Sequence, residues 1–313
     1  MRRPVFPAAA LALGVSLLTP AVVATQATPA TQEQAPVFRA GADIVSVEAS
    51  VRRDRRAVTG LKATDFELLD NGVLQEVTDL SYEKLPIDVT VLLDTSASVT
   101  GAALDRLRYA LRQLRGDLGT KDHLRLMTFN MRVRRLVDFG DPAAVTDKAL
   151  ASLDGSGSSA VFDSLAVALS SATPPGRRQL VVLFSDGQDS SSIIDAETVL
   201  DVARRSTPTV AVVLSSASGQ RPAALLRNST KLASATVTHL VNQIASETGG
   251  FVSTITPEED VTSAFRRVLE QFRTSYVLYF TPKGVERQGN HTLDVRVKNA
   301  KVEVRARRGY IWR

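Results

Sequence analysis

Residues 87–98 read Ile-Asp-Val-Thr-Val-Leu-Leu-Asp-Thr-Ser-Ala-Ser, an apolar strand that runs into a D-x-S-x-S loop at Asp94. A second apolar strand, residues 180–184, runs into Ser-Asp-Gly at Asp186. A hydroxyl-rich turn, residues 155–159, lies between them and directly precedes a helical pattern. Two carboxylates and several hydroxyls at strand ends form a donor set made only of oxygen, which hard cations such as Mg²⁺ prefer.

The chain around these strands alternates apolar strands with amphipathic helices from residue 86 to about residue 272. This alternation predicts an α/β fold: a doubly wound, mostly parallel six-stranded sheet with helices on both faces. With the strand order 3-2-1-4-5-6, the strands that end at Asp94 and Asp186 are neighbours at the point where the order reverses, which is where ligands bind in such sheets. We expect strands at 87–93, 122–129, 132–137, 179–184, 208–214 and 250–254, and helices at 101–115, 143–153, 160–171, 195–205, 237–247 and 257–272.

Residues 256–259, Thr-Pro-Glu-Glu, resemble an N-cap, an N1 proline and a capping-box glutamate, so we expect the last helix to begin there. Residues 222–233 lie in a long connection and could form a short separate helix.

The segments on either side, residues 37–85 and 273–313, have strand-like patterns. Asp70-Asn71-Gly72 between apolar runs predicts a hairpin. Residues 292–298 and 302–307 alternate apolar and polar side chains. Each segment is too small to bury a good core alone, so we expect both to form one small β-domain, with residues 86–272 inserted between its halves.

The N-terminus has the features of an export signal. Arg2 and Arg3 precede an apolar stretch at residues 5–18, and small residues follow at a possible cleavage site. We expect residues 1–24 to be a signal peptide and residues 25–36 a disordered linker. An uncleaved anchor is the alternative, but the apolar run is short for a span, and the rest of the chain shows no transmembrane stretch. The protein is therefore expected to be periplasmic or secreted, with attachment to the envelope left open.

Composition excludes several classes of function. The 313 residues contain no cysteine, which excludes disulfides, thiolate catalysis and Cys-ligated metal sites. A formal charge of +5, an aromatic content of 5% and the export signal all argue against a nucleic-acid partner. Nothing in the sequence indicates the oligomeric state.

Over about residues 86–272 the sequence resembles the von Willebrand factor A domain family, and the likeness looks closest to secreted bacterial proteins that carry this domain. The matching motif is the family's metal-ion-dependent adhesion site. Asp94, Ser96 and Ser98 match its D-x-S-x-S loop, Ser159 falls where the family usually has threonine, and Asp186 matches the last ligand.

The resemblance implies that Ser96 and Ser98 ligate Mg²⁺ (or Mn²⁺) through their hydroxyls and that Ser159 does so directly or through water. Asp94 and Asp186 would act mostly through water. Two carboxylates only just neutralise a divalent cation, so the ion would keep an open position for an Asp or Glu carboxylate from a partner protein. Serine at position 159 keeps the hydroxyl but lacks the methyl that stiffens a threonine rotamer.

The sequence leaves three functions to compare. The first is an exported module that binds protein partners through the metal. The second is a metal-assisted hydrolase, which needs a general base, whereas His123, His239 and His291 belong to no catalytic motif. The third is a structural envelope protein with a vestigial metal site. Of the other acidic residues nearby, Asp163 is expected to be structural and Asp189 to be exposed to solvent.

Overall fold

The strand that leads to Asp94, β6 (Ile87–Asp94), is buried along its whole length in the middle of a six-stranded sheet. The computed structural model describes residues 44–83, 85–171, 173–215, 228–256 and 259–312, with only the backbone of 228–236. The sheet order, β11-β10-β9-β6-β7-β8, is the 3-2-1-4-5-6 order that makes the strands ending at Asp94 and Asp186 neighbours. Neighbouring strands are parallel except for β7 and β8. The other strands are β7 (His123–Phe129), β8 (Val133–Val137), β9 (Arg178–Ser185), β10 (Thr209–Ser215) and β11 (Phe251–Ile255).

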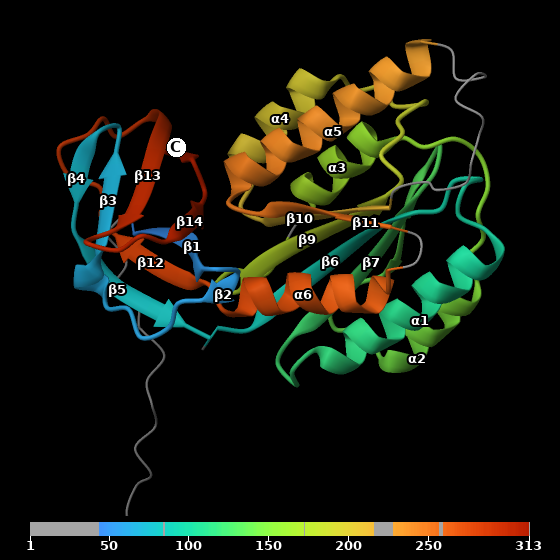
Figure 1. Cartoon of the computed structure of the whole chain (residues 1–313), viewed down its shortest axis with the longest axis horizontal. Helices are drawn as coiled ribbons and strands as arrows, with labels where there is room; N and C mark the ends of the chain where they lie inside the picture. Colours follow the sequence, from blue (N-terminus) through green and yellow to red (C-terminus); the bar gives the residue numbers. More distant parts are fainter. Residues whose placement is uncertain (1–43, 84, 172, 216–227, 257–258, 313) are drawn as a thin grey trace, which may run out of the picture. The chain divides into compact units, whose positions relative to one another are not determined.

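Helices cover both faces of this sheet, as Figure 1 shows. On one face, α1, α2 and α6 share a core with alternate side chains of β6, among them Val89 and Val91. On the other face, α3, α4 and α5 pack against β9, β10 and Leu92 of β6. The predicted α/β class is therefore confirmed. The helices are α1 (Gly101–Asp117), α2 (Ala143–Ala151), α3 (Val161–Ser170), α4 (Ala196–Arg205), α5 (Asn228–Thr248) and α6 (Val261–Arg273).

Two predicted helix boundaries were wrong. Helix α5 begins at Asn228, well before the expected residue 237, because no glycine or proline interrupts the chain from there to Thr248. Residues 222–227 of the predicted short helix lie outside the described residues. Helix α6 begins at Val261, because the Asp260 side chain caps it by accepting hydrogen bonds from two backbone N–H groups.

The two flanking segments form one β-domain, as predicted. Strand β12 (Tyr276–Phe280) follows α6 and lies between β1 and β5, both from before residue 86. Strand β13 pairs with β3 in the same way. The predicted hairpin joins β3 to β4, with positive φ at Asn71 and Gly72. The other strands here are β1 (Val45–Arg53), β2 (Arg56–Ala57), β3 (Phe66–Asp70), β4 (Val73–Gln75), β5 (Val77–Tyr82), β13 (Gly289–Val297), β14 (Glu303–Ala306) and β15 (Gly309–Trp312), with a 3₁₀ turn η1 (Ala63–Asp65).

Arg178, at the start of β9, links the sheet to α6 and to β1. Its buried guanidinium donates a hydrogen bond of 3.1 Å to the Glu48 carboxylate of β1. It also donates to the backbone carbonyl oxygens of Phe272 and Arg273 at the C-terminus of α6, and it stacks over the Phe272 ring at 4.4 Å. One cation thus satisfies helix carbonyls that have no partner within the helix.

The predicted signal peptide and linker, residues 1–36, lie outside the described part of the chain. Within that part, no helix is both long enough and apolar enough to cross a membrane.

Candidate metal centre

Asp94 ends β6 with a side chain that is closed off from solvent. Its Oδ1 accepts a hydrogen bond of 2.9 Å from the backbone N–H of Ser96. Its Oδ2 accepts one of 2.9 Å from the hydroxyl of Ser185, the last residue of β9. The Ser159 hydroxyl lies 3.3 and 3.4 Å from the two carboxylate oxygens. The carboxylate is therefore fixed in orientation by three separate segments of the chain.

The charge on Asp94 has no cation beside it among these contacts. Burial raises the pKa of this carboxyl, and the neighbouring Asp186 carboxylate raises it further, whereas the hydrogen bonds from Ser96 and Ser185 oppose the rise. A buried anion that lacks a counter-charge is costly. A divalent cation near the two carboxylates would remove that cost, so the electrostatics of the site fit a metal ion.

The D-x-S-x-S loop brings two hydroxyls together. The Oγ atoms of Ser96 and Ser98 lie 3.0 Å apart, with Ser96 buried and Ser98 exposed. Backbone hydrogen bonds of 2.9 Å join this loop to the hydroxyl-rich turn, from Ala97 N–H to Gly157 O and from Ser156 N–H to Thr95 O. These two hydrogen bonds hold the loops against each other.

Gly155 allows this close approach of the two loops. A Cβ atom at this position would lie 1.9 Å from the backbone oxygen of Val99 and 2.9 Å from the Thr100 side chain. Only glycine fits there without a backbone shift. The turn then delivers Ser159, which is buried, to the edge of the Asp94 carboxylate.

Asp186 follows β9 directly and is partly buried, with its Oδ1 accepting a hydrogen bond of 3.1 Å from the N–H of Gln188. Register pairs Leu93 of β6 with Phe184 of β9, so the ends of these two strands lie side by side. The structure thus brings together all five residues predicted from the sequence: Asp94, Ser96, Ser98, Ser159 and Asp186.

Two nearby aspartates have structural roles. Asp163 accepts hydrogen bonds from the N–H groups of Ile193 and Ile194, which agrees with the structural role expected for it. The expected exposure of Asp189 was wrong, because this side chain is partly buried and accepts hydrogen bonds from Phe162 N–H and from Ser192. Together they hold the loop after Asp186 against the start of α3.

A pocket of about 650 Å³ lies at the carboxyl ends of the strands. Ser96, Ser98, Ser159 and Asp186 line it. Sequence reasoning missed three residues here. Ser185, which orients Asp94, was visible as the serine of Ser-Asp-Gly. Arg106 of α1 and Glu259 line the pocket from elements far away in sequence; no motif marks Arg106, and Glu259 was considered only as a helix-capping residue.

The donor set suits a hard cation held mainly by hydroxyls. Among the described residues, no group of three or more histidine, cysteine, aspartate or glutamate side chains is placed to hold a metal. The candidate centre has two carboxylates and three serine hydroxyls, all oxygen donors. None of the three histidines lines the pocket; His123 contacts Asp88 and His291 contacts Asp70.

The fold and this arrangement of strand ends agree with a comparison of the sequence against protein families. The von Willebrand factor type A domain matches residues 88–267. The chain belongs to the family of proteins that contain this domain, a module that typically serves protein interaction and adhesion. No curated protein matches the chain in a sequence comparison.

Solved structures with a similar fold come from several bacteria. A von Willebrand factor type A protein from Catenulispora acidiphila is 10% identical, with a TM-score of 0.47 over 88% of this chain and 76% of that one. The von Willebrand factor domain of the type V pili tip protein Mfa5 from Porphyromonas gingivalis is 12% identical, with a TM-score of 0.46 over 59% and 94%. The conserved hypothetical protein BatB from Bacteroides thetaiotaomicron is 14% identical, with a TM-score of 0.45 over 59% and 98%.

Proposed function

We propose that this protein is an exported, metal-dependent protein-binding module. In this proposal Ser96, Ser98 and Ser159 hold Mg²⁺ (or Mn²⁺) with their hydroxyls, and Asp94 and Asp186 neutralise it, mostly through water. The ion keeps an open position, which an Asp or Glu carboxylate of a partner protein fills. The cation is thus the contact between the module and its partner.

The observation that carries the proposal is the convergence of three loops on one buried carboxylate. Two hydroxyls 3.0 Å apart, a third beside Asp94 and a second carboxylate at the next strand end face one pocket. With few charged ligands, a bound Mg²⁺ would keep most of its Lewis acidity for an incoming anion. Arg106 at the rim adds a positive charge that favours an acidic partner.

A binding role is favoured over hydrolysis because, among the described residues, no free general base lines the pocket. The ionisable side chains that line it there are Asp186, Arg106 and Glu259, and the Glu259 carboxylate already accepts a hydrogen bond of 2.9 Å from the N–H of Thr256. A metal-assisted hydrolase needs a group that deprotonates water next to the ion.

Isothermal titration of Mg²⁺ and Mn²⁺ into the purified protein tests the metal site. We expect saturable one-site binding, weakened at least about tenfold by Ser98→Ala and by Asp186→Ala. Ser98 is exposed, so its replacement should leave the fold intact. Ser158→Ala is the matched control, because Ser158 lines the same pocket but is not a predicted ligand. Equal affinities for Ser98→Ala and the wild type would refute the assignment.

Binding to arrays of acidic peptides tests the partner class. We expect capture of peptides with Asp or Glu that is lost in EDTA, restored by Mg²⁺ and absent for Ser98→Ala. Capture that survives EDTA would contradict a role for the metal in partner binding. Export is tested by sequencing the N-terminus of the mature chain, which should begin near residue 25.

A further inference from the structure

Two exposed apolar side chains lie beside the candidate metal centre. Among the described residues, the most exposed large apolar side chains are Ile193 at 94%, and Met131 and Leu74 at 65% each. Single exposed apolar residues are common on protein surfaces and need no explanation. Ile193 and Met131 differ from such residues in their position, because both adjoin the hydroxyl-rich turn that carries Ser159.

Met131 lies between β7 and β8 and contacts the hydroxyl-rich turn. A Cβ atom at Gly157, which lines the pocket of the candidate metal centre, would lie 3.5 Å from the Met131 sulfur. Asn130 holds the two segments together: its side chain donates a hydrogen bond of 3.0 Å to Ser156 O, and its carbonyl oxygen accepts one of 3.0 Å from Ala160 N–H. Met131 is therefore fixed next to the pocket, with most of its side chain in solvent.

Ile193 lies in the loop that follows β9, and this loop is also tied to the metal centre. The N–H groups of Ser190 and Ser191 both donate to Ser159 O, and Ser190 lines the pocket. Ile193 follows Ser190 by three residues, so their Cα atoms are at most about 11 Å apart. Its N–H donates a hydrogen bond of 3.0 Å to Asp163, and the next residue packs against the core. The backbone is thus held in place while the Ile193 side chain stays in solvent.

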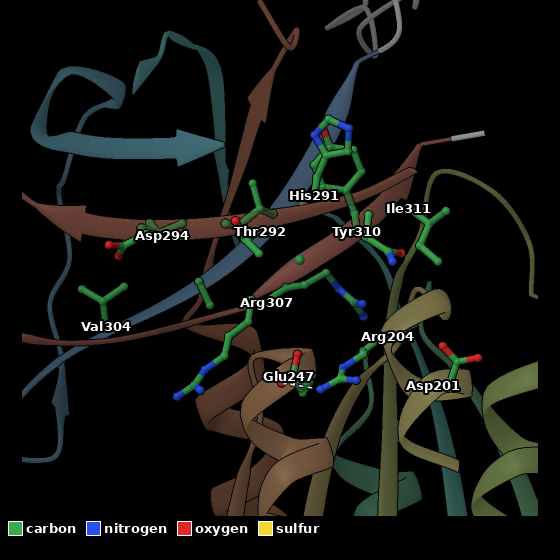
Figure 2. A pocket seen from close by; sticks show the side chains of 16 residues that line it. Asp201, Arg204, Glu247, His291, Thr292, Asp294, Val304, Arg307, Tyr310 and Ile311 are labelled. Atoms are coloured by element: carbon green, nitrogen blue, oxygen red, sulfur yellow. Dashed lines mark hydrogen bonds and ion pairs between the residues drawn. The ribbon is translucent and has the colours of Figure 1, made fainter. Parts of the chain in front are cut away.

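A larger cavity elsewhere in the protein has no such side chains next to it. This cavity of about 750 Å³ lies where β13, β14 and β15 meet α4 and α5 (Figure 2). Within the described ranges, none of the exposed large apolar side chains lines it. At its edge Arg204 and Glu247 pair with each other at 3.5 Å. Ile193 and Met131 therefore adjoin the candidate metal centre and not this second cavity.

The surface near Met131 is positively charged. Arg132 follows Met131 in sequence, and Arg106 of α1 lines the pocket. Both arginines are exposed, and neither forms an ion pair in the part of the chain that the structure describes. A bound cation would add to this positive charge. An acidic segment of a partner would complement these charges, and apolar side chains in the same segment would find Met131 and Ile193 beside them.

We propose that the partner of the metal centre is an acidic segment with apolar side chains, which pack on Met131 and Ile193 while its Asp or Glu reaches the metal. This inference rests on the proposed function, because it takes the metal as the central contact. A standard interface covers about 800 Å² on each protein, a disc with a radius of about 16 Å. Met131 contacts the turn that carries Ser159, and Ile193 is close to residues bonded to Ser159, so one partner can cover both.

Capture by matched peptides tests this partner class. The probes are immobilised peptides of about nine residues, which span about 30 Å when extended. Each has a central Asp, with leucine or serine in every combination at the other positions. The purified protein is applied in Mg²⁺ and in EDTA. We expect capture only in Mg²⁺, with the best leucine-containing peptides bound at least about tenfold more tightly than the peptide that contains only serine around the Asp.

Met131→Ser and Ile193→Ser should each reduce this preference for leucine, and the double variant should abolish it. The Mg²⁺ affinity and the capture of the serine peptide should not change. Leu74→Ser is the matched control, because Leu74 is as exposed as Met131 but lies on β4 of the β-domain. A wild-type preference in the double variant, or no preference for leucine in the wild type, would overturn this inference alone. Capture that does not depend on Mg²⁺ would overturn the proposed function, and this inference with it.

Discussion

The Ser185 hydroxyl donates a hydrogen bond of 2.9 Å to Oδ2 of Asp94, across the junction of the two central strands. The same hydroxyl accepts a hydrogen bond of 3.1 Å from Gly187 N–H. Ser185 therefore connects the loop that carries Asp186 to the carboxylate at the end of β6. The two halves of the candidate metal centre are oriented by one side chain that is not itself a predicted ligand.

Asp94→Asn should change how the stability of the metal-free protein depends on pH. The pKa of Asp94 in the folded state is raised by burial and by Asp186, so folding favours the neutral acid. The resulting stability is fully present below the unfolded pKa and is lost as the pH rises through the folded-state value. Asparagine keeps the shape without the charge, so the variant should not show this loss.

The measurement is the thermal midpoint of both proteins in EDTA from about pH 4 to about pH 7. The thermal midpoint of the wild type should fall relative to that of Asp94→Asn as the pH rises. Mg²⁺ should raise the wild-type midpoint near neutral pH and leave that of the variant unchanged, because a ligand stabilises only the state that binds it. If the thermal midpoints of the two proteins changed with pH in the same way in EDTA, ionisation of Asp94 would not destabilise the folded protein.

Gly155→Ala should weaken the metal centre without altering any donor. The new methyl group would meet the Val99 backbone oxygen at 1.9 Å, so the hydroxyl-rich turn must move away from the D-x-S-x-S loop. We expect a loss of about 1–3 kcal/mol in the free energy of unfolding and a clearly lower Mg²⁺ affinity. Gly116→Ala is the control: nothing lies within 4 Å of that position in α1, and helical alanine should gain about 0.5–1 kcal/mol. Unchanged metal affinity in Gly155→Ala would mean that the turn is not needed.

Arg178→Met should lower the free energy of unfolding by about 3 kcal/mol. This value is at the lower end of the range for breaking a buried ion pair, because the Glu48 side chain is 20% exposed. The variant removes the guanidinium donor from this carboxylate and from the last carbonyls of α6, although the Thr209 hydroxyl still donates to Glu48 and the Ser275 N–H to Phe272 O. Urea unfolding measures the change, with Arg135→Met, an exposed arginine, as the control. Adding Glu48→Met should restore part of the loss, because both charges are then absent. Simple addition of the two effects would argue against a coupled pair.

Tyr276 lies in the C-terminal segment of the β-domain and contacts the N-terminal segment, so its replacement tests how strongly the two segments hold together. Its ring is buried, and its hydroxyl donates to Val58 O at 2.8 Å and accepts from Leu61 N–H at 3.1 Å. Tyr276→Ala should cost about 3–5 kcal/mol in unfolding free energy. Tyr276→Phe should cost about 1–3 kcal/mol, because it leaves both backbone groups unpaired. Tyr109→Phe, at an exposed position, should be neutral; similar values for all three substitutions would contradict the pairing of the segments.

The sheet and the five candidate ligands could be predicted from the sequence because both depend on local patterns. Continuous apolar runs mark buried parallel strands, and the residue that ends each run must lie at the carboxyl edge. The hairpin at Asn71 was equally predictable, since positive φ at two consecutive positions favours Asn-Gly.

The rest depended on contacts between distant residues or on competing local signals. The start of α6 was predicted at residues 256–259, but Asp260 is the cap, because its side chain accepts hydrogen bonds from two N–H groups of the first turn. The contact of Asp163 with Ile193 joins residues thirty positions apart, with strand β9 between them. Strand β15, which pairs with β13, was not predicted, because a strand of four residues is too short to show a clear alternation of apolar and polar residues.

The strands that lead into and out of the inserted domain, β5 and β12, are hydrogen-bonded neighbours, and the pair next to the insertion is Tyr82 with Tyr276. The two rings pack with 4.7 Å between their centroids. If a partner held by the inserted domain were pulled, the tension would reach the β-domain through both strands at once. The pair Tyr82–Tyr276 is the first rung of the β5–β12 ladder that this tension would load, beside the separate link from Arg178 to Glu48.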